Sequence, residues 1–217
     1  MRKLKVITDY PNAVSSPDYL SPIGAKQDNH SNENYLKEID GLTKNKPYSY
    51  MDLGCAGGQA VIDIYNKGNI SCGIEGSDLD VMLNNSTHGV RESWINYKDI
   101  CLFKADITKP FTVLDENDEL QLFDIITAWD VLEHPVPEDI PNVIDNIIKH
   151  LKSDGVFVAL VNIVNGTHHQ CVKPESWWLD IFKEKGLENV GFGMDTSPRH
   201  LTNPIGENDF GFMFKFK

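Results

Sequence analysis

The chain has 217 residues, of which 41% are hydrophobic and 24% are charged, and its formal net charge is −12. This length suits one domain with a substantial core, or a domain with an appendage. An acidic chain without a cluster of lysine and arginine repels phosphate backbones, so we expect no nucleic-acid partner. No apolar stretch approaches the length of a membrane span, and no apolar segment follows the basic residues at the start. We therefore expect a cytoplasmic protein with no signal peptide and no membrane partner.

Residues 1 to 45 differ in composition from the rest of the chain. They are rich in proline, serine, asparagine and aspartate, which is typical of loops, and one short helix is predicted from Asn32 or Glu33 to Leu42. We therefore divide the chain into an N-terminal arm over 1–45 and a main domain over 46–217. Three alternatives remain open for the arm: a lid, a mobile tail, or a contact between two copies in a homodimer.

From Tyr48 onwards, predicted strands alternate with predicted helices. Apolar runs predict strands over 48–53, 70–74, 100–104, 122–129, 156–162, 188–192 and 210–216. Helical spacing predicts helices over 59–66, over 78–84, near 90–94, from Asp139 to a cap at Gly155, and from Pro174 to Gly186. At least one of Trp177 and Trp178, in the last of these helices, must face the sheet.

This alternation predicts an α/β fold. Strands joined by helices form right-handed crossovers, which give a doubly wound, mostly parallel seven-stranded sheet with helices on both faces. The last two strands have no helix between them, so the last strand is expected to be antiparallel.

A stretch of small residues, "DLGCAGGQ", lies between the first of these strands and the first helix. Small residues there let the backbone approach a ligand at the carboxyl end of a strand. One alternative is a tight turn without a ligand. Another is a nicotinamide dinucleotide site, but its G-x-G-x-x-G pattern, read from Gly54, breaks at the third and sixth positions. An acid at Asp52 is also atypical of that site.

Acidic residues follow the next three predicted strands. Glu75 can accept hydrogen bonds from both hydroxyls of a ribose, and Asp106 can accept one from an adenine amino group while Ile107 packs on the ring. Asp130 follows the fourth strand. Since the carboxyl ends of parallel strands meet at one edge of the sheet, all of these residues are expected to face one crevice.

The segments DLGCAGG, GIEGSD, FKADI, FDIITAWDVLEH and LKSDGVFVAL resemble the class I S-adenosylmethionine-dependent methyltransferases over about residues 47–217. The family's first motif is D-x-G-x-G-x-G, and Ala56 stands here for its middle glycine. The resemblance implies S-adenosylmethionine as the cofactor. It implies a site at the methionine moiety formed by Asp52, Gly54, Cys55, Ala56 and Gly58. It implies Glu75 and Gly76 at the ribose, Asp106 and Ile107 at the adenine, and Trp129 and Asp130 beside the sulfonium and the substrate.

Three histidines are candidates for catalysis or acceptor binding. His134 follows the fourth strand and is either a base or hydrogen-bonding group for the substrate, or a cap of the loop before Pro135. The resemblance places His168 and His169, which follow the fifth strand, at the acceptor pocket, with His169 at the better spacing. The alternative is a solvated loop. The sequence predicts no metal site, because no further ligands stand at metal-binding spacing, and the four cysteines are expected to be free thiols.

The resemblance implies an enzyme that transfers a methyl group to an oxygen or nitrogen of a small polar acceptor, such as a sugar or a nucleotide-linked metabolite. Two alternatives remain: a methyltransferase of protein side chains, and a non-catalytic subunit that keeps the fold.

Overall fold

The computed structural model describes residues 3–20, 22–79 and 88–217. Its main sheet has seven strands in the order β4-β3-β2-β6-β7-β9-β8. Their bounds are β2 Ser49–Leu53, β3 Ile70–Glu75, β4 Leu102–Lys104, β6 Phe123–Trp129, β7 Leu151–Asn162, β8 Leu187–Asn189 and β9 Asp209–Phe216. Strands β4, β3, β2, β6 and β7 are parallel, and β9 is antiparallel to both β7 and β8. The predicted fold class, including the antiparallel last strand, is confirmed.

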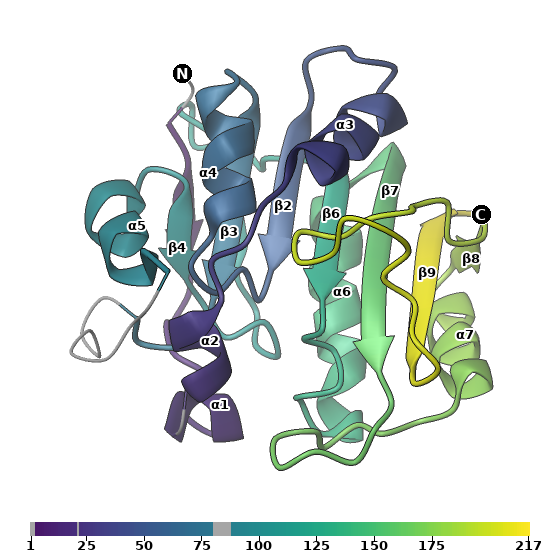
Figure 1. Cartoon of the computed structure of the whole chain (residues 1–217). Helices are drawn as coiled ribbons and strands as arrows, with labels where there is room; N and C mark the ends of the chain where they lie inside the picture. The colour runs from purple at the N-terminus through teal and green to yellow at the C-terminus, as the bar shows by residue number, and fades with distance from the viewer. Residues whose placement is uncertain (1–2, 21, 80–87) are drawn as a thin grey trace.

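Helices cover both faces of this sheet (Figure 1). One face carries α3 (Glu33–Leu42), α4 (Gln59–Asn66) and α5 (Val90–Tyr97), and the other carries α6 (Ile140–His150) and α7 (Glu175–Glu184). The sheet therefore separates two cores, because neighbouring side chains of a strand point to opposite faces. Trp178 of α7 is fully buried in one of these cores, as expected for one of the two tryptophans.

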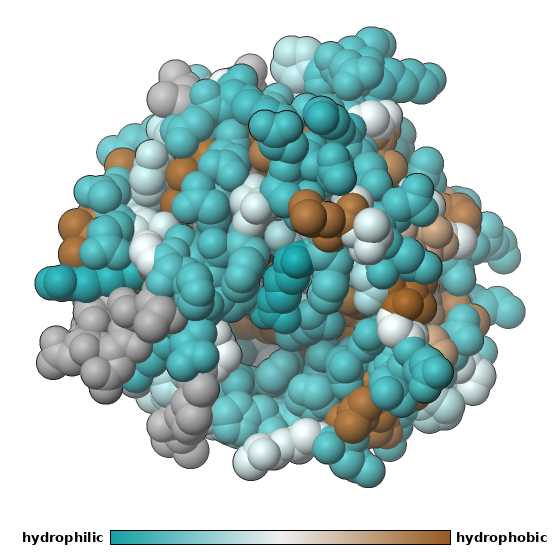
Figure 2. Space-filling model, in the orientation of Figure 1, coloured by the Kyte–Doolittle hydropathy of each residue, from teal (hydrophilic) through white to brown (hydrophobic). Residues whose placement is uncertain are grey.

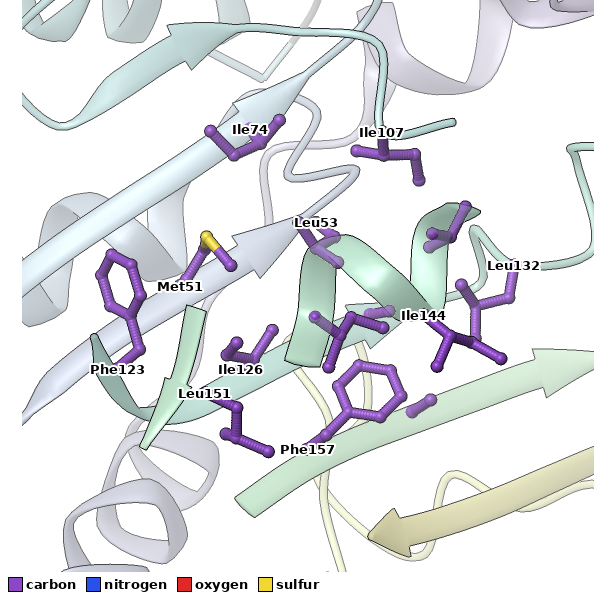
Figure 3. Packing of buried hydrophobic residues seen from close by; sticks show 14 of the residues in the cluster. Met51, Leu53, Ile74, Ile107, Phe123, Ile126, Leu132, Ile144, Leu151 and Phe157 are labelled. Carbon is purple, nitrogen blue, oxygen red and sulfur yellow. The ribbon is translucent and has the colours of Figure 1, made fainter. Parts of the chain in front are cut away.

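The core beneath α6 shows how the sequence pattern produces the packing. Ile140, Val143, Ile144 and Ile147 recur at helical spacing, and all are fully buried. Figure 3 shows Ile144 near Phe157 of β7 and near Leu132, which follows β6. Burial of each such aliphatic side chain contributes roughly 1.5–3 kcal/mol, so α6 is held to the sheet chiefly by this stripe.

The end of α6 corrects one sequence prediction. The helix ends at His150 rather than at Gly155, and β7 already begins at Leu151, which pairs with Phe123. A Cβ atom at Gly155 would lie 3.0 Å from the Phe123 carbonyl oxygen, so glycine allows a close approach between strands here instead of capping the helix. The strand expected over 188–192 is Leu187–Asn189. Most of the helix predicted over 78–84 lies outside the described residues.

The N-terminal arm has more regular structure than its composition suggested. Strand β1 (Lys5–Ile7) pairs with β5 (Thr112–Leu114) in a small antiparallel sheet. Two short helices follow, α1 (Pro17–Leu20) and α2 (Ile23–Gln27), at the end of the main sheet to which the parallel strands point (Figure 1). Helix α3 has the predicted bounds, and the Asn32 side chain caps it by accepting a hydrogen bond from the Tyr35 N–H.

None of the helices in the described part of the chain is long and apolar enough to cross a membrane.

Candidate functional site

A cavity of about 260 Å³ lies at the carboxyl ends of β2, β3, β4 and β6. In Figure 2 a hollow opens near the middle of a mostly hydrophilic face. Residues of the arm, among them Ala13, Ser16, Asp18 and Asp28, line the cavity opposite the strand ends. The sequence predicted a crevice at this edge of the sheet, and the structure places a cavity there.

The cavity brings together most of the residues that the sequence singled out. The predicted residues that line it are Gly54, Ala56, Glu75, Gly76, Asp106, Ile107, Trp129, Asp130 and His134. The predicted residues that do not line it are Asp52, Cys55, Gly58, His168 and His169.

The glycine-rich turn owes its residue types to packing as well as to the cavity. Gly54 has a φ of +70°, and a Cβ atom there would overlap the Val131 side chain. Gly58 has a φ of +77° and begins α4, and a Cβ atom there would overlap Leu102. Both positions require glycine because the left-handed region disfavours other residues and neither position has room for a side chain. Gly58 is thus needed for the turn itself, whether or not a ligand is bound.

Glu75 is held rigidly at the end of β3. It is buried, its Oε2 accepts the Ala56 N–H at 2.9 Å, and its Oε1 accepts the Ser77 N–H at 2.7 Å. Burial raises the pKa of this carboxyl, while the two backbone N–H groups oppose the shift. The Ser77 side chain also hydrogen-bonds to this carboxylate. Two carboxylate oxygens have about four acceptor positions in all, so Glu75 can still accept a hydrogen bond from a ligand hydroxyl.

Asp106 is positioned in a similar way after β4. Its Oδ1 accepts hydrogen bonds from the Thr108 N–H at 2.9 Å and from the Thr108 hydroxyl at 2.7 Å. Its own N–H donates to the Tyr10 carbonyl at 2.8 Å, which ties the arm to the strand end. With Ile107 beside it, Asp106 gives this end of the cavity one carboxylate and one apolar side chain.

Asp52 stands at the end of a buried chain of hydrogen bonds that sequence reasoning missed. Trp129 Nε1–H donates to the Tyr35 hydroxyl at 3.1 Å, and the Tyr35 and Tyr50 hydroxyls are 2.9 Å apart. The chain continues from Tyr50 to Thr127 at 2.8 Å, and the Thr127 hydroxyl donates to Asp52 Oδ1 at 2.6 Å. Burial raises the pKa of Asp52 to about 7, although the bond from Thr127 opposes the shift.

Arg199 is a second feature without a sequence signal. It lies on the long connection between β8 and β9, and its Nη1 donates to Asp130 Oδ2 at 2.7 Å. Its Nε donates to Asp28 Oδ2 at 2.7 Å, so the guanidinium bridges the arm and the end of β6. Burial by itself raises the pKa of Asp28, but the bonds from Arg199 hold this pKa below its usual value. Arg199 also lines the cavity, which gives this part of the site a cation.

Asp18 of α1 joins two of the predicted histidines. His134 Nδ1 forms an ion pair with Asp18 Oδ2, and His168 Nδ1 lies 2.8 Å from Asp18 Oδ1. Burial lowers the pKa of His134, but the hydrogen bond and charge of Asp18 have a larger combined effect, so the pKa of the ring is raised. The ring of His169 lies 5.1 Å from that of His134. The three histidines therefore lie close together, but only His134 lines the cavity. Asp18 had not been predicted from the sequence.

Residues 27–190 match the family model described as "Methyltransferase domain". No curated protein has a significantly similar sequence. Among solved structures, the PH0226 protein of Pyrococcus horikoshii is 13% identical, with a TM-score of 0.60 over 97% of each chain. A TehB-like SAM-dependent methyltransferase of Corynebacterium glutamicum is 17% identical, with a TM-score of 0.59 over 95% of this chain and 100% of that one. The glycopeptide N-methyltransferase MtfA, in complex with S-adenosylmethionine, is 9% identical, with a TM-score of 0.55 over 88% and 97%.

Proposed function

We propose that this chain, which belongs to the class I S-adenosylmethionine-dependent methyltransferases, transfers a methyl group to an oxygen or nitrogen of a small polar acceptor. The observation that carries the proposal is the way in which the residues that line the cavity are distributed across the strands of the sheet. Glu75 and Asp106 line it on the side of β3 and β4, Gly54 lines it at β2, and Asp130 and His134 line it beyond β6. One cavity thus offers a place for a nucleoside and a polar place for a second molecule.

The residues on the β3 and β4 side fit S-adenosylmethionine. Glu75 is buried, fixed by two N–H groups and free to accept hydrogen bonds from ribose hydroxyls, and Asp106 with Ile107 suits an adenine ring. Gly54 and Ala56 would hold the methionine moiety. When bound, the cofactor supplies an electrophilic methyl group on a sulfonium centre.

The residues beyond β6 would bind and orient the acceptor. An oxygen acceptor loses its proton as the methyl group arrives, and His134, which lines the cavity, can accept it when its ring is neutral. Arg199 and Asp130 offer a paired donor and acceptor for polar atoms, as hydroxyl and amino groups of a sugar-like acceptor require.

The arm supports a small acceptor rather than a protein side chain. Asp18, Ala13 and Asp28 line the cavity opposite the strand ends, and the Ala13 N–H donates to the Gly76 carbonyl at 2.9 Å. We propose that the arm is a lid, which excludes water from the reacting groups and limits the size of the acceptor.

Calorimetric titration of the full chain tests the cofactor part of this proposal. We expect micromolar binding of S-adenosylmethionine and S-adenosylhomocysteine and no binding of NAD. Glu75→Ala should weaken binding by roughly 1–3 kcal/mol, as for lost hydrogen bonds to a charged group, while replacement of the exposed Glu92 by alanine should not. Because Glu75 also holds the turn, thermal melting of each variant must show that it is folded. Unchanged affinity in folded Glu75→Ala would refute the ribose assignment.

Mass spectrometry of mixtures with candidate acceptors tests the rest. We expect a methylated product from hydroxyl- or amine-bearing small molecules. Methylation of peptides but of no small molecule would favour the protein-directed alternative. Cofactor binding without any product would favour a non-catalytic subunit.

A further inference from the structure

Glu133, His134 and His169 come together beside the cavity. The first two follow β6, and His169 lies in the loop between β7 and α7. Each offers one atom of a kind that binds metals, and these atoms all lie within 4.8 Å of one another. The separation of His169 from the other two in the sequence is why no ligand spacing revealed the group.

Hydrogen bonds leave the same nitrogen available on both histidines. His134 Nδ1 is paired with Asp18, and His169 Nδ1 lies 2.7 Å from the Val164 carbonyl oxygen. Once Nε2 is deprotonated, each ring keeps its contact at Nδ1 and has a lone pair on Nε2 for a metal ion. Histidines that bind metals are usually held this way, with the second nitrogen on a carboxylate or a backbone carbonyl.

Glu133 supplies an independent observation. Its side chain is 0% exposed, and its Oε1 accepts the Asn162 N–H at 3.2 Å. Its Oε2 is buried and has no hydrogen-bond partner among the residues that the structure describes. A buried carboxylate oxygen without a partner is unfavourable, and a bound cation would satisfy it.

The backbone holds these groups together without help from an ion. The Glu133 carbonyl accepts the N–H groups of Gln170 and Cys171 at 2.8 and 2.9 Å. The Gln170 side chain donates to the His134 carbonyl at 2.8 Å. The loop that carries His169 is therefore fixed against the end of β6, so little reorganisation is needed for binding.

We propose that Glu133, His134 and His169 bind a divalent transition-metal ion of the zinc or cobalt class. Two imidazoles and one carboxylate favour such an ion over magnesium or calcium, which prefer oxygen ligands. Three protein ligands leave a coordination position open, as in catalytic zinc sites. Since His134 lines the cavity, an ion bound by its ring would lie beside the place where an acceptor would bind.

The chemical consequence rests on the proposed function. An acceptor hydroxyl in the open position would have its pKa lowered by the ion, which assists loss of its proton. Asp18, which lines the cavity beside His134, or solvent would receive that proton.

The test is titration of the chelator-treated full chain with Co²⁺, followed by calorimetry and visible absorbance. We expect one Co²⁺ ion per chain, competed by Zn²⁺ and not by an equal concentration of Mg²⁺. Glu133→Gln, which keeps the shape of the side chain, and His169→Ala should each weaken binding by about tenfold or more. His30→Ala, which removes a histidine outside the group, should bind as the parent does.

Circular dichroism and melting curves establish whether each variant is folded. If His169→Ala does not fold, Glu133→Gln is the decisive variant. Absence of Co²⁺ binding by the parent chain would overturn the proposal, and so would equal affinity in folded Glu133→Gln. Equal weakening in His30→Ala would overturn it as well, because the ion would then bind elsewhere. Binding of S-adenosylmethionine by the metal-free chain is measured separately, so failure of the metal site is distinguishable from failure of the proposed function.

Discussion

At the residue scale, Ala56 occupies a position whose backbone favours glycine. Its φ is +48°, in the left-handed region that disfavours residues with a Cβ atom. Both of its backbone groups are engaged, since its N–H donates to Glu75 and its carbonyl accepts the Trp94 Nε1–H at 2.9 Å. The backbone therefore cannot relax to relieve the strain, and the alanine that departs from the family motif destabilises the turn.

Ala56→Gly should consequently raise the free energy of unfolding. A left-handed alanine costs roughly 1–2 kcal/mol, and the greater flexibility of unfolded glycine offsets about 0.5–1 kcal/mol of that. We expect a net gain of up to about 1 kcal/mol in urea unfolding, with cofactor affinity retained.

Gly54→Ala is the matched change in the opposite direction. Its Cβ atom would overlap Val131 in addition to the backbone strain, so we expect a loss of roughly 1–3 kcal/mol. Combination with Val131→Ala should recover part of the loss. A destabilised Ala56→Gly, or a Gly54→Ala chain as stable as the parent, would contradict this account of the turn.

At the scale of elements, the buried hydrogen bonds from Trp129 to Asp52 link α3, β2 and β6. Each hydroxyl in the chain can donate toward the next, and the last acceptor is the Asp52 carboxylate. Helix α3 of the arm is thereby connected to the strand end that carries the glycine-rich turn. Because these groups are buried, each depends on its partner, which makes the arrangement of the three elements specific.

The raised pKa of Asp52 predicts a pH dependence of stability. Its pKa is about 7 in the folded chain, against about 3.9 in an unfolded one. Between these values the folded state binds more protons, so the free energy of unfolding should fall as pH rises and level off above the folded pKa. Asp52→Asn keeps an acceptor for Thr127 and should reduce this slope in urea unfolding at about pH 5, 6 and 7.

Asp180→Asn, at an exposed position of α7, serves as the control and should leave the slope unchanged. A slope that is identical in Asp52→Asn and in the parent would show that Asp52 is not the group responsible.

The elements that the sequence predicted well are those with a strong burial pattern. The stripe of α6 and the apolar runs of β6 and β7 allow one interpretation each, because their burial determines their residue types. The short elements β1, α1 and α2 were missed, since three to five residues are too few to show a period. The end of α6 was misplaced because Gly155 resembles a helix cap, whereas it is required by the approach of β6 and β7.

At the scale of the whole molecule, the arm and the long connection between β8 and β9 meet at the cavity. The Asn32 side chain donates to the Ser197 carbonyl at 2.8 Å, and Glu38 Oε2 accepts the Asp195 N–H at 3.0 Å. Arg199 joins Asp28 to Asp130 beside them. These contacts link residues between 69 and 171 positions apart, so local patterns in the sequence cannot reveal them. Glu75, Asp106 and Asp130 could be predicted because each stands at or just after the end of a strand. Arg199, Asp18 and Asp28 do not, although they also line the cavity.

Removal of Arg199 should weaken the attachment of the arm over the cavity. Without the guanidinium, Asp28 and Asp130 are two acidic groups with no shared cation. We therefore expect Arg199→Met to speed dissociation of S-adenosylhomocysteine by about tenfold in stopped-flow measurements. A tenfold change corresponds to about 1.4 kcal/mol. Limited proteolysis should cut the arm of Arg199→Met faster than that of the parent. The unfolding free energy should fall by no more than about 1 kcal/mol, because the side chain is 37% exposed and water screens the ion pair.

Arg91→Met removes an exposed arginine from α5 and should change neither rate. If Arg199→Met releases the ligand as slowly as the parent does, the ion pairs do not hold the arm over the site. In that case the backbone bonds of the arm to Gly57, Gly76 and Asp106 are enough to keep it closed.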